Sequence, residues 1–180
     1  TPTGPSASEA AANALAELDP ELAAQTKPAR PGRCILHLGH THSLLLIYCE
    51  DKLVSIRALL WGGAEVSQQI AKALSVAPFE AVKVLITRGC ILLNPNGATP
   101  DQRLISDTIA SAMDSLIRDV RLTLLELNTN ANISVASVEV LGGTSQIENL
   151  SPYLTQVLGI PVHTNPEFLA AKPTRFEVTP

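Results

Sequence analysis

The spacing of apolar and polar positions changes along the chain, and these changes predict where strands and helices lie. Apolar runs at residues 34–36, 44–48 and 53–60 are separated only by short polar turns. Such short connections predict a three-stranded antiparallel meander. A further strand is expected over residues 135–141, parallel to one member of the meander.

Apolar residues that recur every three or four positions predict helices between and after these strands. The four predicted helices cover residues 64–75, 78–87, 100–127 and 151–158. The first and third of these helices are expected to pack on the sheet, which gives a layered α/β fold. Gly159 is expected to end the last helix, and residues 160–162 to start an edge strand.

The two ends of the chain differ in composition from its middle. Residues 1–33 are predicted to form a tail, a short alanine-rich helix and a linker, the linker being the proline-rich residues 25–33. Residues 34–166 are expected to form the folded domain. Residues 167–180 are expected to form a C-terminal tail.

Composition narrows the classes of function. The formal net charge of −4 and the aromatic content of 3% disfavour a nucleic-acid partner, which needs a basic surface or stacking rings. No run reaches the ~18 consecutive apolar residues that a membrane span needs. The three cysteines, Cys34, Cys49 and Cys90, lack metal-ligand spacing, so we expect reduced, buried thiols.

Loops of small residues that follow apolar strands are the first candidates for a binding site. Glycines and hydroxyl residues in such loops can offer backbone amides and hydroxyls to phosphates and ribose. The same glycines are equally expected wherever a fold needs a tight turn. The candidate ligand-binding residues are Gly39, Thr41, Ser43, Gly62, Gly63, Gly142, Gly143 and Thr144.

Three histidines in the first loop suggest a metal site as an alternative. His37, His40 and His42 carry imidazoles, which soft transition metals favour. No cysteine or carboxylate stands at a convincing spacing to complete a ligand set. We therefore expect solvated histidines and assign no metal ligand.

Residues 36–43, Leu-His-Leu-Gly-His-Thr-His-Ser, resemble the second phosphate loop of actin-like ATPase domains. Residues 52–63 look like the next strand and its Gly-Gly turn into a helix, and residues 140–145 are similar to the adenosine loop. The order and spacing of these segments most resemble the PilM family of type IV pilus assembly. The cytoplasmic GspL-like domains of type II secretion come next. The resemblance covers residues 34–166.

The resemblance implies an actin-like (ribonuclease H-like) subdomain, the second half of a two-domain protein. It also implies a cytoplasmic scaffold, peripheral to the inner membrane, in a pilus or secretion platform. Its partners would be other platform subunits, with homo-oligomers as a further option. The first phosphate loop of the family would precede Thr1.

One departure from the family pattern bears on catalysis. In actin-like ATPases an Asp before the loop glycine helps to organise magnesium and water, whereas His37 stands here. A neutral imidazole is a poor ligand for Mg²⁺, which prefers oxygen. We therefore assign no catalytic residue and expect a degenerate nucleotide site, while ATP binding stays open. The alternative is an ATPase or kinase relative that uses catalytic residues of the missing half.

Overall fold

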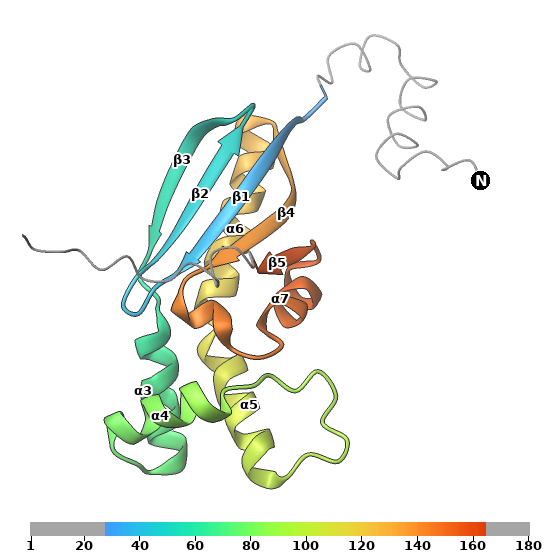
Figure 1. Cartoon of the computed structure of the whole chain (residues 1–180). Helices are drawn as coiled ribbons and strands as arrows, with labels where there is room; N and C mark the ends of the chain where they lie inside the picture. Colours follow the sequence, from blue (N-terminus) through green and yellow to red (C-terminus); the bar gives the residue numbers. More distant parts are fainter. Residues whose placement is uncertain (1–27, 165–180) are drawn as a thin grey trace, which may run out of the picture.

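The computed structural model describes residues 28–164 (Figure 1). The predicted N-terminal helix and the predicted C-terminal tail lie outside this range. The described elements are β1 (Arg30–Leu38), β2 (Ser43–Cys49), β3 (Lys52–Leu59), α3 (Gly63–Leu74), α4 (Pro78–Arg88), α5 (Pro100–Ala112), α6 (Asp114–Ala131), β4 (Ile133–Leu141), the 3₁₀ turn η1 (Gly143–Gln146), α7 (Leu150–Leu158) and β5 (Val162–Thr164).

The described strands form one five-stranded sheet in the order β3-β2-β1-β4-β5. Strands β1, β2 and β3 pair antiparallel, and β4 pairs parallel to both β1 and β5. The predicted meander with an added parallel strand is confirmed. Strand β1 begins earlier than predicted, at Arg30, within the segment expected to be a linker. The reason is that β1 pairs with β4 from its first residue. The Arg30 amide donates to the carbonyl of Asn132, just before β4 begins.

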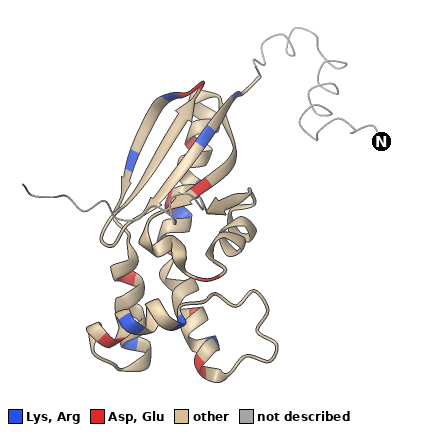
Figure 2. Ribbon diagram, in the orientation of Figure 1, with Lys and Arg blue, Asp and Glu red and all other residues tan. Residues whose placement is uncertain are grey.

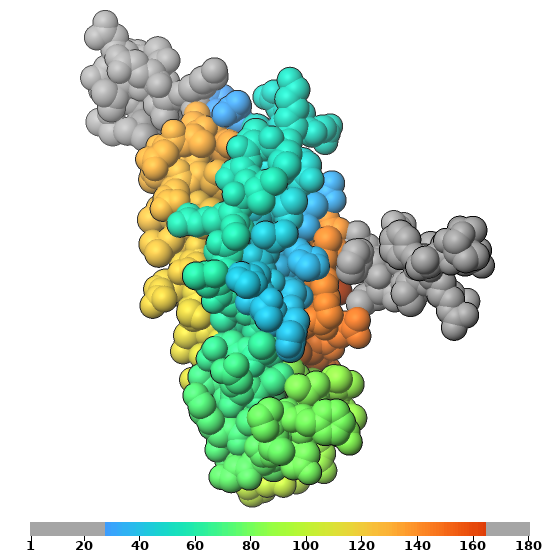
Figure 3. All heavy atoms as spheres, turned by 90° about the vertical axis from the view of Figure 1, so that its left-hand side faces the viewer, coloured from blue at the N-terminus to red at the C-terminus, as the bar shows by residue number. Residues whose placement is uncertain are grey.

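Alternate residues of the central strands point to a single buried face. Cys34, Leu36 and Leu38 of β1 are fully buried, whereas the residues between them are only partly covered. Helix α6 packs on this buried face, mainly along β4. Strand β3 forms the edge of the sheet, and its side chains are mostly exposed in the face that Figure 3 shows.

Helices α3, α4 and α5 lie beyond one end of the sheet (Figure 1). Helix α3 packs chiefly against α4 and α5. The prediction that it packs on the sheet is therefore wrong, while the same prediction is right for α6. The molecule thus has two bodies, a sheet covered by α6 and a group of three helices at its end.

The single long helix predicted over residues 100–127 is in fact two helices. Helix α5 ends at Ala112, Met113 adopts φ −90° and ψ −8°, and α6 then runs on to Ala131. The last carbonyls of a helix have no amide partner within that helix. Here the buried indole of Trp61 donates from Nε1 to the Ala112 carbonyl over 2.7 Å. The helix is therefore interrupted where a distant side chain satisfies the otherwise unpaired Ala112 carbonyl.

The three cysteines are free thiols, as predicted, but only two of them are buried. Cys34 and Cys49 lie in the core, and Cys90 is partly exposed. Burial raises the pKa of the Cys34 thiol to about 12. The thiolate, which is the reactive form, is therefore disfavoured at Cys34.

We expect Trp61→Phe to lower the free energy of unfolding by about 1–3 kcal/mol, because the buried Ala112 carbonyl loses its donor. Urea denaturation followed by circular dichroism measures the change. Thr108→Val is the control, since it removes an exposed hydroxyl that donates to the Leu104 carbonyl and should cost less than about 0.5 kcal/mol. Equal losses in both variants would contradict the role given to Trp61.

A thiol-specific reagent at pH 8 should label Cys90 first in the native protein. Cys34 and Cys49 should react only when urea unfolds the chain, because burial protects both of them and also suppresses the Cys34 thiolate. Peptide mass spectrometry identifies the labelled positions over time. Labelling of native Cys34 at the rate of Cys90 would show that the sheet core is open.

Candidate functional site

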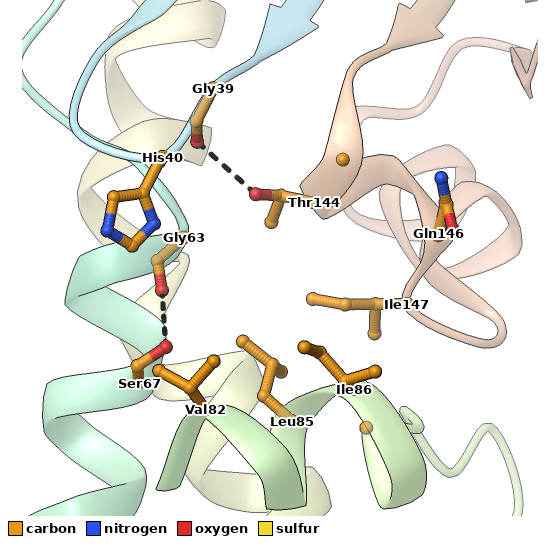
Figure 4. Close-up of a pocket in the computed structure, with 12 residues that line it drawn as sticks. Gly39, His40, Gly63, Ser67, Val82, Leu85, Ile86, Thr144, Gln146 and Ile147 are labelled. Atoms are coloured by element: carbon orange, nitrogen blue, oxygen red, sulfur yellow. Dashed lines mark hydrogen bonds between the residues drawn. The ribbon is translucent and has the colours of Figure 1, made fainter. Parts of the chain in front are cut away.

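A cavity of about 440 Å³ opens where the sheet meets α3 and α4 (Figure 4). It lies at the end of the sheet where β1 and β4 finish, and both predicted small-residue loops border it. Its lining residues are Gly39, His40, Gly63, Ser67, Val82, Leu85, Ile86, Gly89, Gly143, Thr144, Gln146 and Ile147.

The β1–β2 loop is bonded backbone to backbone to the start of α3. The Gly63 amide donates to the Gly39 carbonyl over 3.0 Å, and the Ala64 amide donates to the His40 carbonyl over 2.8 Å. A Cβ at Gly62 would lie 2.3 Å from the His40 carbonyl oxygen, so only glycine permits this approach. The first amides of α3 are therefore engaged by protein carbonyls, although helix N-termini elsewhere often hold phosphate.

The second loop is held to the first by one side chain. The Thr144 hydroxyl donates to the Gly39 carbonyl over 3.2 Å, across the top of the cavity (Figure 4). Gly142 supplies the turn into η1 with φ 97°, a conformation that favours glycine. A Cβ at Gly142 would also lie 2.3 Å from the Leu38 carbonyl oxygen.

Helix α4 forms the opposite wall. Pro78 at its first turn and Gly89 just after its last residue set its limits. A short parallel bridge then fixes its end, since the Ile91 amide donates to the Glu148 carbonyl over 3.0 Å. This bridge places the apolar side of α4 across from Ile147.

Only part of the predicted site comes together at the cavity. Gly39, Gly63, Gly143 and Thr144 line it. Ser43 is buried instead and donates to the Trp61 carbonyl over 2.9 Å, which ties β2 to the turn before α3.

The remaining predicted residues are turn or surface positions. Thr41 is exposed, and its hydroxyl lies 3.0 Å from the ring nitrogen Nδ1 of His42. Gly62 and Gly142 allow their backbone to pass close to a carbonyl of the β1–β2 segment. The α4 wall was not predicted from the sequence. No sequence signal marked it, because the exposure of Ile86 and the scarcity of buried positions in α4 are seen only in the structure.

The lining of the cavity carries little charge. None of its residues is Asp, Glu, Lys or Arg. Figure 2 shows charged residues on the helices and strands, whereas the β1–β2 loop and the turn into α3 have none. A phosphate in this cavity therefore meets no Lys or Arg side chain from its lining.

The three histidines do not converge. His37 lies opposite Leu44 of β2 and Leu141 of β4, on the face of the sheet away from α6, and His40 borders the cavity. Among residues 28–164 no three His, Cys, Asp or Glu side chains form a group that could hold a metal ion. The metal hypothesis gains no support.

Comparison with known proteins identifies the fold. The family model of cell division protein FtsA matches residues 34–173. No curated protein matches the chain. Among solved structures, the PilM–PilN type IV pilus biogenesis complex is similar with 26% identity and a TM-score of 0.63, over 93% of this chain and 45% of that one. The predicted resemblance to PilM is thereby confirmed.

Two further structures share the fold at lower identity. EutJ, an ethanolamine utilization protein from Carboxydothermus hydrogenoformans, has 16% identity and a TM-score of 0.60, over 83% of this chain and 49% of its own. MreB5 of Spiroplasma citri bound to AMPPNP has 19% identity and a TM-score of 0.61, over 79% and 50%. The chain spans about half the length of each of these relatives. The predicted actin-like fold is confirmed.

Two glycines of the loops beside the cavity should respond differently to the same substitution. Gly62→Ala should lower the free energy of unfolding by about 2–3 kcal/mol, because its Cβ meets the His40 backbone. Gly143→Ala should stay within about 0.5 kcal/mol, since a Cβ there meets nothing within 4 Å. Urea denaturation of both variants checks this, and a tolerated Gly62→Ala would refute the described packing of loop on helix.

Proposed function

The chain belongs to the FtsA family, and from this premise we propose that it is a protein-binding scaffold of a type IV pilus assembly platform. The relation to PilM gives the pilus context. Under the proposal it corresponds to the second half of a PilM-like protein at the cytoplasmic face of the inner membrane. A type II secretion platform, in which GspL-like subunits occupy the corresponding place, is the second context that we propose for the same role.

The observation that carries the proposal is the contrast between the shape of the cavity and its chemistry. The two glycine loops still meet around a cavity, joined by the Thr144 hydroxyl. Yet His37, at the position where active relatives place a metal-organising Asp, lies on the sheet face and is not part of the cavity lining. A site lined by no carboxylate, Lys or Arg supports binding and assembly better than phosphoryl transfer, which needs a metal and charge stabilisation.

The PilM relative suggests which partners this chain binds. The PilM structure is a complex with PilN, another protein of pilus biogenesis. We propose that this chain likewise binds subunits of its platform, and further copies of itself as a second mode. Within residues 28–164, no helix combines the length and the apolarity of a membrane span.

A second candidate function is nucleotide hydrolysis with residues supplied from outside the chain. It is favoured by the cavity itself and by the similarity to an MreB5 structure that contains AMPPNP. Under this alternative, the metal-binding and catalytic groups would come from a domain that matches the part of these relatives that the chain does not span.

The scaffold proposal predicts partner binding that is independent of ATP. The full-length protein should bind the cytoplasmic tail of its inner-membrane platform subunit with the same affinity, within about twofold, with and without saturating Mg-ATP. Phosphate release should equal that of a protein-free control. Isothermal titration calorimetry and a phosphate assay measure the two quantities.

Gly143→Phe tests whether an open cavity is needed for partner binding. Gly143 lines the cavity and has open space around it, so a phenyl ring there should obstruct the cavity. This variant should keep partner binding, with its fold checked by circular dichroism. ATP turnover, or partner binding that requires ATP, would favour the second candidate.

A further inference from the structure

Strand β3 has one side without a partner strand. It is the outermost strand of the sheet, and among the described strands it pairs only with β2. Figure 3 looks onto this free side. The backbone amides and carbonyls that point away from β2 form a row with which another strand can pair. This free edge is therefore a candidate surface for binding a strand of another chain.

The side chains beside the free edge are largely apolar. Ile56 is 60% exposed, Val54 is also exposed, and so is Leu44 of β2, which lies opposite Ala58. Arg57 bonds to α6, so its neighbours Ile56 and Ala58 point to the face of the sheet away from that helix. A group of exposed apolar side chains next to unpaired backbone marks an interaction surface.

The features that normally keep a strand edge from pairing are confined to the first half of β3. Such edges are commonly blunted by lysine, proline or a β-bulge. Lys52 begins the strand. The register with β2 shifts between Ile47 and Tyr48, which leaves Val54 as an extra residue. Residues 55–59, Ser-Ile-Arg-Ala-Leu, contain no lysine or proline and pair with β2 without a shift, so this half of the edge is open to pairing.

The sequence beside the free edge suits a second copy of the same chain. In an antiparallel pair, residues directly opposite each other lie on the same face of the sheet and contact each other. A two-fold axis at Ile56 places this side chain opposite its own copy, and Val54 opposite Ala58 of the second copy. An axis at Arg57 would instead place two like charges opposite each other, which is unfavourable. The axis at Ile56 therefore gives apolar contacts on one face and is the favoured register.

The other face of the same pairing carries polar groups that match. The axis at Ile56 places Arg57 opposite Ser55 of the second copy. In the structure only Nη1 of Arg57 is engaged, by Thr123 Oγ1 over 3.0 Å and by Glu126 Oε2 over 2.7 Å. A guanidinium has further N–H donors, so Arg57 can also donate to the Ser55 hydroxyl. Because the axis is two-fold, this polar pair forms twice.

We propose that two copies of this chain associate by antiparallel pairing of their β3 strands about Ile56. The pairing covers residues 54–58 of each copy, and one continuous sheet then runs through both. So short an interface gives a transient dimer with a micromolar or weaker dissociation constant. The inference rests on the proposed function, in which further copies of the chain are the second mode of binding, and it adds the surface and the register through which they meet.

Sedimentation velocity of the full-length protein over a concentration series tests the dimer. Ile56→Lys should weaken dimerisation at least about tenfold, because it removes the central apolar contact and places two like charges opposite each other. Leu125→Lys is the matched control, since Leu125 is 59% exposed but lies on α6, and it should leave the dissociation constant within about twofold. A wild-type protein that stays monomeric at millimolar concentration overturns the inference, as do equal effects of the two substitutions.

Disulfide trapping tests the register. The Cα atoms of directly opposite residues lie about 4.5–5.5 Å apart in an antiparallel pair, within the range that a disulfide spans. Cys90→Ser first removes the partly exposed native thiol. In that background Ile56→Cys should give a covalent dimer on a non-reducing gel after mild oxidation, whereas Leu125→Cys should stay monomeric. Equal cross-linking of both variants, or none at Ile56→Cys, would show that β3 does not pair with its copy about Ile56.

The dimer and the scaffold proposal can fail separately. If the protein is monomeric, the binding of platform subunits still stands, because it is tested with and without Mg-ATP. Protection of Ile56→Cys from a thiol reagent by a platform subunit, in a monomeric protein, would assign the free edge to that subunit and overturn the dimer. If the full-length protein hydrolyses ATP, the scaffold proposal fails, while sedimentation and cross-linking still decide the dimer by themselves.

Discussion

The backbone contact between the β1–β2 loop and the start of α3 is the constraint on which the rest of the structure depends. Two amides of α3 donate to the carbonyls of Gly39 and His40, and Gly62 permits the approach. This contact sets one side of the cavity and fixes where α3 leaves the sheet. It also uses the amides that a helix N-terminus would otherwise offer to a phosphate. One local arrangement therefore gives the cavity its shape and limits its chemistry.

Trp61 connects the sheet to the group of helices beyond its end. The chain passes between the sheet body and the group of helices α3, α4 and α5 at two points, the turn before α3 and the bend at Met113. Trp61 lies at the first point, and its indole donates to Ala112 beside the second. Ser43 then holds the Trp61 carbonyl from β2. These hydrogen bonds thus join the sheet and the group of three helices at the points where the chain crosses between them.

The sequence predicted most elements because burial on a single face gives each strand and helix its own period. It did not predict the bend at Met113, because the apolar stripe continues through it and the cause is a residue 51 positions away from Ala112. For the same reason the glycine loops were found and the α4 wall was not. A glycine in a tight turn reflects a local backbone conformation that the sequence alone can indicate. The position of α4 depends instead on a contact between distant residues, the bridge between Cys90 and Glu148 that follows the helix.

The glycines and the charged positions of this site answer to different physical constraints. A side chain at Gly62 or Gly142 would collide with a backbone carbonyl, so the fold requires these glycines whether or not a ligand binds. No such requirement acts on residue 37, whose side chain lies on a partly covered sheet face and can change without disturbing the core. A chain can therefore lose the chemistry of a nucleotide site and keep its sequence motif. It follows that the donors still free to meet a ligand are a better guide to function here than the glycines that match the family pattern.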